Sequence, residues 1–209
     1  MQPKPGQSPH DFWNDLYRGA RHQTDGRPSA VLERFVADRI PGRALDLGCA
    51  KGDDAIWLAR RAWDVVAVDI AQAALDIAQA NAANRGAAAR IKFECHDLAK
   101  SCPEGPFDLI SAMFLQTPFD FPRRSIFARA YQQLAPGGLL LVATHGSTAP
   151  WSWSKEGARY PSPEEDLTEL GFSPLDAQVS FVGAFRRTAH GPDGQTAEVL
   201  DNVIALVRE

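Results

Sequence analysis

The chain has few cysteines, and none of them are spaced as a metal-binding or redox pair. Its 209 residues include only Cys49, Cys95 and Cys102, with no Cys-x-x-Cys motif. Neither a disulfide framework nor a zinc site is therefore indicated. A chain of this length buries about 70% of its unfolded surface on folding, so it needs no covalent or metal crosslink. We expect three reduced thiols and no bound metal.

The sequence also lacks a strong excess of charge and any long apolar run. Its 22 Lys and Arg residues against 26 Asp and Glu give a net charge of −4. Nucleic-acid binders usually carry a basic face, so we expect no nucleic-acid partner. No apolar stretch approaches the ~20 residues of a membrane helix, and the first ten residues lack a signal-peptide core. These absences predict a cytoplasmic protein without a membrane partner, and they leave its oligomeric state open.

Between residues 43 and 208 short apolar runs alternate with longer helical segments. This alternation is typical of a parallel sheet covered by helices on both faces. It predicts an α/β fold with a doubly wound, Rossmann-like sheet. The expected strands are 44–47, 65–68, 91–94, 109–112 and 139–143, with helices near 55–62, 71–84 and 125–134.

The regions flanking these strands have different patterns. Apolar residues at helical spacing predict a short helix over 11–17 and a second helix that opens at Pro28. A Ser-, Pro- and Trp-rich stretch over 146–163 predicts a lid or loop, and a helix is expected to follow over 163–170. Two late apolar runs around the turn at 191–194 predict a hairpin. We expect one domain, 1–209, consisting of a helical cap (1–42), a core (43–145), a lid (146–175) and an antiparallel hairpin (176–209).

The first predicted strand runs into Asp46-Leu47-Gly48-Cys49-Ala50-Lys51-Gly52. Ligands bind at the carboxyl ends of strands in open α/β sheets, and Gly48 and Gly52 would let the backbone approach a ligand. A glycine turn here also occurs for steric reasons alone.

Acidic residues end the next two strands as well, at Asp69 and Asp97. A carboxylate at the tip of the second strand accepts hydrogen bonds from a ribose in dinucleotide-type folds. Asp69 also suits the N-cap of the helix that follows. Asp97 is placed to accept from an adenine amino group. Three carboxylates at three successive strand ends favour a nucleoside ligand.

Together these residues resemble the class I S-adenosylmethionine (SAM)-dependent methyltransferases over residues 43–144, with Phe107 to Ile110 and Pro136-Gly137-Gly138 completing the pattern. The N-terminal region is similar to that of the small tellurite-resistance and thiopurine methyltransferases. The resemblance implies a seven-stranded sheet that ends in a hairpin, and SAM as cofactor. It also implies cofactor contacts from Asp46, Gly48, Cys49, Gly52, Asp69, Ile70, Asp97, Leu98, Met113 and Phe114.

The sequence departs from the family pattern at Ala50, which replaces the middle glycine of the loop. An alanine there is expected to avoid positive φ. A nicotinamide dehydrogenase, the competing function on this fold, expects Gly-x-Gly-x-x-Gly, whereas here the spacing is Gly-x-x-x-Gly.

The acceptor is expected to be a small molecule. The segment after the fourth strand lacks the Asn/Asp-Pro-Pro-Tyr/Phe motif of base and glutamine methylation, and no Pro-Cys pair is present. His145 after the fifth strand suits a general base, or hydrogen-bonds a loop. Arg27 suits an acceptor carboxylate, or faces solvent. The expected substrate contacts are Trp13, Tyr17, Arg27, Gln116, His145 and Trp151.

A second hypothesis is a SAM-binding sensor or partner protein without catalysis. The missing middle glycine and the lack of a recognisable acceptor motif motivate it.

Overall fold

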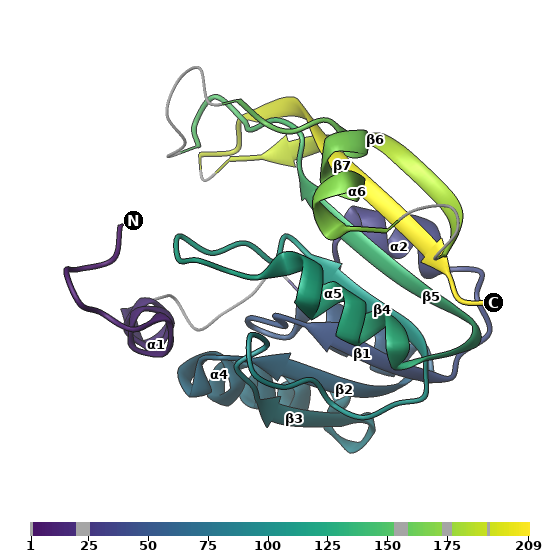
Figure 1. The fold of residues 1–209 in the computed structure, drawn as a ribbon. Coiled ribbons are helices and arrows are strands. Elements are labelled where there is room, and N and C mark those ends of the chain that lie inside the picture. The colour runs from purple at the N-terminus through teal and green to yellow at the C-terminus, as the bar shows by residue number, and fades with distance from the viewer. Residues whose placement is uncertain (1, 20–25, 153–158, 173–176, 192) are drawn as a thin grey trace.

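The computed structural model describes residues 2–19, 26–152, 159–172, 177–191 and 193–209. Its centre is a seven-stranded sheet of order β3-β2-β1-β4-β5-β7-β6, parallel except for β7, which runs antiparallel to both neighbours (Figure 1). The predicted α/β, Rossmann-like fold with a C-terminal antiparallel hairpin is confirmed. The strands are β1 (Arg43–Leu47), β2 (Asp64–Asp69), β3 (Ile91–Cys95), β4 (Phe107–Met113), β5 (Leu134–His145), β6 (Gln178–His190) and β7 (Thr196–Val207).

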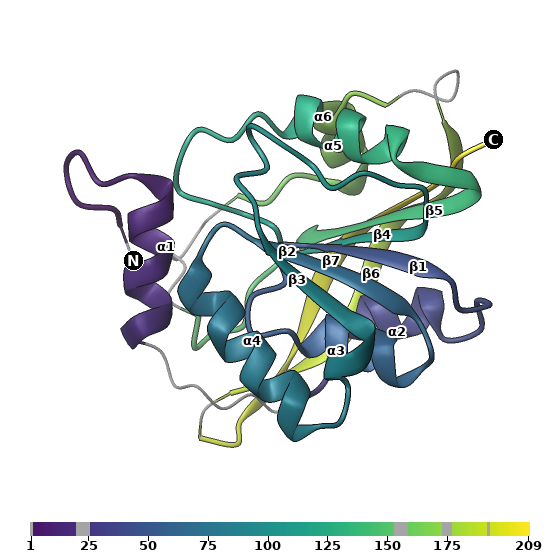
Figure 2. The same ribbon diagram turned by 90° about the horizontal axis from the view of Figure 1, so that it is seen from below.

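Helices cover both faces of the sheet. α2, α3 and α4 lie on one face and α5 and α6 on the other (Figure 2). Successive side chains of a strand point to opposite faces, so Leu139 and Leu141 pack with the first group and Leu140 and Val142 with the second. The helices are α1 (Pro9–Gly19), α2 (Ala30–Val36), α3 (Asp53–Arg60), α4 (Gln72–Asn84), α5 (Arg123–Gln132) and α6 (Pro163–Leu170), with a 3₁₀ turn, η1 (Ala88–Arg90).

Helix α1 stands beside the carboxyl ends of the parallel strands. The Ser8 hydroxyl accepts from the Asp11 backbone N–H at 3.1 Å, and Pro9 occupies the first helical position, so α1 starts earlier than the expected residue 11. Helix α2 begins at Ala30 and not at Pro28, because Ser29 is still extended at φ −55°, ψ 131°.

Two strands begin earlier or run longer than the sequence predicts. β5 starts at Leu134, which pairs with Phe107 ahead of a bulge, so Pro136-Gly137-Gly138 lies inside the strand and does not form a turn before it. The β6–β7 pairing continues out to His190 opposite Thr196. These extensions depend on partner strands, which local patterns do not encode.

Helix α6 has the predicted bounds, and its ends explain why. Ser162 and Glu165 form a reciprocal capping box at the start, and Gly171 ends the helix at φ +80°. The buried Asp166 carboxylate accepts from Thr144 Oγ1 at 2.5 Å and from Asn202 Nδ2 at 2.9 Å. These bonds anchor α6 to β5 and β7.

Within the described ranges, none of the helices is both long and apolar enough to cross a membrane.

Candidate functional site

The loop between β1 and α3 is bound to the end of β2. The backbone N–H groups of Gly48 and Cys49 both donate to the Val68 carbonyl at 2.9 Å. Gly48 and Gly52 lie at φ +74° and +85°, values that glycine adopts without strain. Gly52 also N-caps α3, and an added Cβ there would lie 3.0 Å from Ala78 Cβ. Glycine at position 52 is therefore needed for the turn and for the close packing of the loop against α4.

Ala50 contradicts the expectation that an alanine in this loop avoids positive φ. Its φ is +50°, in the left-handed region. Its N–H donates to Asp69 Oδ2 at 3.1 Å, and this bond helps to fix the conformation. The loop therefore keeps the left-handed geometry of a glycine at this position, at a backbone cost of about 1–2 kcal/mol.

The carboxylate of Asp69 is buried at the tip of β2. Besides Ala50, it accepts from the Ala71 N–H at 2.9 Å, so the N-cap alternative correctly describes one of its contacts. Burial raises its pKa, while the backbone donors at Ala71, Ala50 and Ile70 oppose that rise. Each carboxylate oxygen offers two acceptor positions, which leaves capacity for a ligand hydroxyl.

The end of β3 forms a tight turn. Asp97 Oδ1 accepts from the Ala99 N–H at 3.0 Å, and Asp97 Oδ2 pairs with Lys100 at 2.9 Å. The His96 ring lies 2.9 Å from both Glu94 Oε2 and Ser101 Oγ. The turn presents Asp97 and Leu98 to a neighbouring cavity.

That cavity, here called cavity A, has a volume of about 350 Å³. Strand ends and helix α1 enclose it with many aromatic side chains. Its lining includes these predicted site residues: Trp13, Tyr17, Gly48, Asp69, Ile70, Asp97, Leu98, Met113, Phe114 and Gln116.

A second cavity, here called cavity B, has a volume of about 880 Å³ and is also lined by the glycine loop. Its floor is acidic, formed by Asp46, Asp53 and Asp54, and its wall includes Arg187 and His190 of β6. The predicted residues that line it are Tyr17, Arg27, Asp46, Gly48, Cys49, Met113 and Phe114. Tyr17, Gly48, Ala50, Met113 and Phe114 line both cavities, so they form the junction between them.

Asp46 is the most deeply buried acid in cavity B. Its side chain is 2% exposed. Oδ1 accepts from Ser111 Oγ at 3.2 Å, and Oδ2 has no hydrogen-bond partner within the described part of the chain. Burial, together with nearby Asp54, raises its pKa well above the usual value. Burial raises the pKa of Cys49 as well, so that sulfur stays a thiol.

Phe114 holds a strained backbone at the junction. Its φ is +57°, its N–H donates to the Ala143 carbonyl at 2.8 Å, and its ring stacks on His145 with centroids 4.6 Å apart. Such outliers concentrate at functional sites. Burial lowers the pKa of His145, which is therefore neutral at pH 7, but its ring lies behind Phe114 and lines neither cavity.

An ion pair that the sequence did not predict lies beside Phe114. The Arg187 guanidinium binds the fully buried Asp201 through Nε at 2.5 Å and Nη2 at 3.2 Å, and its Cζ lies 5.8 Å from the Phe114 ring centroid. Both residues belong to the hairpin, and an alternating strand pattern does not show which polar residues pair. Asp54 and Trp57 of cavity B were also missed, although Asp54 lies only two residues after Gly52.

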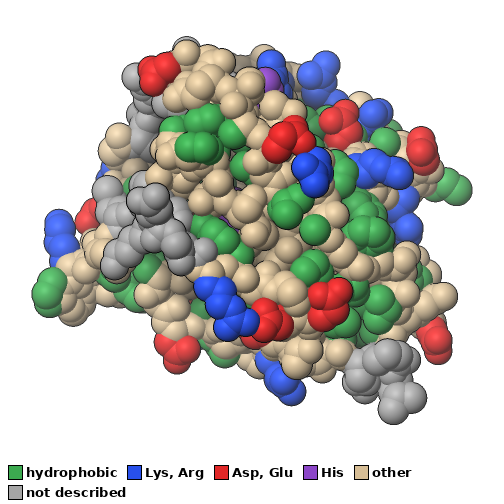
Figure 3. All heavy atoms as spheres, turned by 90° about the horizontal axis from the view of Figure 1, so that it is seen from above, with side chains coloured by type: hydrophobic (Ala, Val, Ile, Leu, Met, Phe, Trp, Pro, Cys, Tyr) green, Lys and Arg blue, Asp and Glu red, His purple; other side chains and the backbone are tan. Residues whose placement is uncertain are grey.

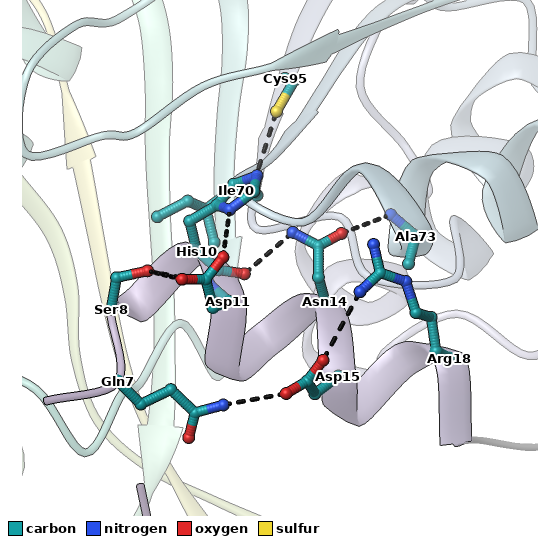
Figure 4. Close-up of polar contacts among 10 residues, drawn as sticks. All are labelled: Gln7, Ser8, His10, Asp11, Asn14, Asp15, Arg18, Ile70, Ala73 and Cys95. Atoms are coloured by element: carbon teal, nitrogen blue, oxygen red, sulfur yellow. Dashed lines mark hydrogen bonds and ion pairs between the residues drawn. The ribbon is translucent and has the colours of Figure 1, made fainter. Parts of the chain in front are cut away.

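Helix α1 is fastened beside the cavities by a buried amide. Asn14, 2% exposed, donates to the His10 carbonyl at 2.8 Å and accepts from the Ala73 N–H of α4 at 3.0 Å (Figure 4). The bond from Asn14 to Ala73 joins α1 to α4 and so places Trp13 and Tyr17 over the strand ends. Trp151 lines neither cavity. Trp153, one of the aromatic residues expected near the site, lies outside the described residues.

Comparison with known proteins also indicates a methyltransferase. A family model described as "Methyltransferase domain" matches residues 44–138. The chain is 31% identical over 116 residues to trans-aconitate 2-methyltransferase of Deinococcus radiodurans (55% of the chain, 42% of the relative). It is 28% identical over 181 residues to ubiquinone biosynthesis O-methyltransferase of a Caulobacter species (84% and 68%), and 29% identical over 120 residues to ribosomal RNA small subunit methyltransferase C of Alcanivorax borkumensis (54% and 35%). The chain thus spans less than half the length of two of these three relatives.

Solved structures share the fold. A protein studied for the conversion of a disulfide bond into a thioacetal group during echinomycin biosynthesis superposes with a TM-score of 0.73 at 20% identity, over 96% of this chain and 93% of that one. Magnesium protoporphyrin IX methyltransferase from Synechocystis with bound S-adenosylhomocysteine (SAH) gives 0.66 at 18% identity (96% and 97%), and TehB from Haemophilus influenzae 0.59 at 14% identity (96% and 67%). Residues 44–138 thus form a methyltransferase domain, of the class I SAM-dependent type.

Proposed function

We propose that the protein transfers the methyl group of SAM to a small-molecule acceptor bound in cavity B. The observation that carries this proposal is the pair of cavities joined at Tyr17, Gly48, Ala50, Met113 and Phe114, with a nucleoside-sized cavity on one side and a larger one on the other. Both volumes lie within the range of small-molecule sites, about 300–1,000 Å³.

The residues present fit the cofactor. The adenosine half matches cavity A, where Asp69 accepts from the ribose and Asp97 and Leu98 flank the adenine. The amino-acid half matches the floor of cavity B, where the buried Asp46 Oδ2 lacks a protein partner within the described chain. An unpaired buried carboxylate oxygen is costly, and a ligand ammonium group satisfies it.

When bound, SAM would supply a methyl group attached to a positively charged sulfur. The nucleophile takes the methyl group, and the rest of the cofactor is the thioether leaving group. The chain's own contribution is mainly positioning, since well-aligned reactants gain ~7–11 kcal/mol. Phe114, fixed by its strained backbone and by His145, stands where cavity A meets cavity B. Arg27 and, on β6, Arg187 and Thr188 line cavity B, and we expect them to contact the acceptor.

His145 as a general base stays a prediction. Its neutral imidazole is able to accept a proton, but it reaches the acceptor only past the Phe114 ring. A pH profile of turnover in wild type and His145→Ala tests the role, because the acidic limb of the profile disappears in the variant if His145 is the base. The cytoplasmic location also stays a prediction.

Ribosomal RNA is the competing acceptor, because one relative carries that name. Two features favour a small molecule: the net charge of −4, and a mixed surface on which acidic and basic side chains are interspersed over the face seen in Figure 3. RNA binding draws most of its affinity from basic contacts to phosphates.

The test is transfer of a labelled methyl group from SAM in a cell extract, followed by separation of RNA, protein and low-molecular-weight fractions. We expect the label in the low-molecular-weight fraction. Label in RNA would replace the small-molecule acceptor with a polynucleotide. Tight SAM binding with no label transferred to any fraction would favour the sensor hypothesis.

A further inference from the structure

The Arg187 guanidinium at the wall of cavity B is only partly used by the protein. Its Nε and Nη2 donate to the fully buried Asp201 at 2.5 and 3.2 Å. Arginine carries five N–H groups in a planar fork, and those on Nη1 have no hydrogen-bond partner among the described residues. The Arg187 side chain is 28% exposed and lines cavity B. Asp201 thus fixes one edge of the guanidinium and leaves the other edge for a ligand.

A carboxylate matches the free edge of Arg187, because parallel N–H donors of a guanidinium meet both oxygens of such a group. The acidic floor of cavity B does not oppose this binding. Asp46 and the pair Asp53 and Asp54 come from β1 and α3. Three strands, β4, β5 and β7, stand between β1 and β6 in the sheet, and Arg187 belongs to β6. The sheet therefore sets Arg187 apart from these acids.

Arg187 also lies close to the junction of the two cavities. Its Cζ is 5.8 Å from the centroid of the Phe114 ring, and Phe114 lines both cavities. The stack on His145 and the hydrogen bond to the Ala143 carbonyl hold Phe114 in place. A carboxylate bound to Arg187 is therefore near the position proposed for the methyl group.

Within the described residues, cavity B offers no imidazole base at this junction. His145 lines neither cavity, because its ring lies behind Phe114. His190 lines cavity B but is exposed, and it stands farther along β6, about 10 Å from Arg187 at the usual strand rise. A hydroxyl or ammonium acceptor has to lose a proton, whereas a carboxylate is already ionised at neutral pH. The site thus suits an acceptor that needs no base.

We propose that the acceptor is a carboxylic acid held by Arg187, and that the protein methylates a carboxylate oxygen to give a methyl ester. One oxygen stays on the guanidinium, and the other forms the new bond to the methyl carbon. The carbon–sulfur bond breaks, and its electron pair stays on sulfur. The negative and positive charges cancel, so no proton moves. The inference rests on the proposed methyl transfer from SAM to a small molecule and adds the class of acceptor.

Alkali distinguishes an ester from the other products, because N-methyl, S-methyl and methyl ether groups survive mild alkali and a methyl ester is cleaved to methanol. The labelled low-molecular-weight fraction is freed of SAM and treated with alkali, and the volatile label is counted. A reaction without the protein is the control. We expect most of the label to become volatile. Label that stays non-volatile overturns the ester and leaves the proposed function intact. No label in the low-molecular-weight fraction overturns the proposed function, and the ester with it.

Arg187→Lys tests which residue holds the carboxylate. A lysine ammonium keeps the charge that pairs with Asp201 but lacks the second edge of the guanidinium fork. At limiting acceptor we expect transfer to fall about tenfold or more, as for a lost hydrogen bond between charged groups. The Kd of SAH, measured by calorimetry, should stay unchanged.

Arg186→Lys is the matched control, because Arg186 is the exposed neighbour on β6, pairs with Glu198 at 3.8 Å and does not line cavity B. It should keep both transfer and SAH affinity. Equal transfer by the two variants overturns the role of Arg187, and so does a weaker SAH affinity in Arg187→Lys that accounts for the whole loss of transfer. The alkali test on the wild-type protein decides the ester even if Arg187→Lys does not fold.

Discussion

Residue 50 is an alanine in a left-handed backbone conformation that glycine adopts more readily, and this leads to a stability prediction. Ala50→Gly removes about 1–2 kcal/mol of strain and costs about 0.5–1 kcal/mol in unfolded-chain entropy. We expect the free energy of unfolding to increase by about 0.5–1 kcal/mol, measured by urea denaturation. The change tests whether the loop has the backbone conformation described above.

The control for Ala50→Gly is the same substitution in an ordinary helix. Ala80 is exposed in α4, so Ala80→Gly should lower the free energy of unfolding by about 1 kcal/mol. Losses of similar size in both variants would contradict the left-handed assignment at residue 50.

Asp69 links the loop, helix α4 and the predicted ribose site. Asp69→Ala should weaken SAH and methylthioadenosine alike by about 1.5–3 kcal/mol, the range for a lost hydrogen bond to a charged group. Calorimetry measures both affinities. Asp64→Ala, an exposed change at the other end of β2, should leave them unaltered. Unchanged binding in Asp69→Ala would remove it from the cofactor site.

Single residues at strand ends were the most predictable part of the site. Asp46, Asp69 and Asp97 end neighbouring parallel strands, so sheet geometry alone brings them to one edge. His145 and Arg187 were less predictable. Their surroundings depend on the antiparallel register that sets His145 opposite Asp201, and the sequence carries no local signal for that register.

At the scale of elements, one buried carboxylate, that of Asp166, bonds α6 to both β5 and β7. Asp166→Ala leaves Thr144 Oγ1 without its acceptor and Asn202 Nδ2 with only the Pro161 carbonyl. Buried groups that lose a partner cost about 1–3 kcal/mol, so we expect a loss of about 2–3 kcal/mol in the free energy of unfolding, measured by chemical denaturation.

Glu164→Ala is the comparison for Asp166→Ala because Glu164 lies in the same first turn but is exposed. It should lose only about 0.3–0.5 kcal/mol through the helix dipole. Equal losses in the two variants would show that helix propensity, and not the anchor, holds α6.

Element types were predictable and their ends only partly so. α6 was predicted to the residue because its capping box and terminal glycine are local signals. The start of β5 was wrong because Leu134 is a strand residue only through its pairing with Phe107. The start of α1 needed recognition of Ser8 as a cap, and Asn14, which fastens α1 to α4, has no sequence signature.

For the whole molecule, the buried carboxyl groups make stability depend on pH. The pKa of Asp54 is about 6 when folded and 3.8 in the usual case. Its stabilising contribution is therefore full below pH 3.8 and is lost as the pH rises through 6. Relative to wild type, Asp54→Asn should gain about 1 kcal/mol of unfolding free energy between pH 5 and pH 7.5. Urea denaturation at both pH values measures it, and a constant difference would contradict the raised pKa.

The sheet and its topology followed from the alternation of apolar runs and helices, while the two cavities did not. Cavity volumes depend on where α1 and the hairpin stand relative to the strand ends. Those placements rest on contacts between segments distant in sequence, such as Asn14 with Ala73 and Arg187 with Asp201.

The proposed cofactor site spans both cavities, with the reactive sulfur at their junction. A crystal structure of the protein with SAH tests it most directly. We expect the adenine beside Asp97 and Leu98, the ribose on Asp69, and the α-ammonium group within hydrogen-bond distance of Asp46. A nucleoside bound in cavity B, or an amino-acid moiety in cavity A, would contradict this placement of the cofactor.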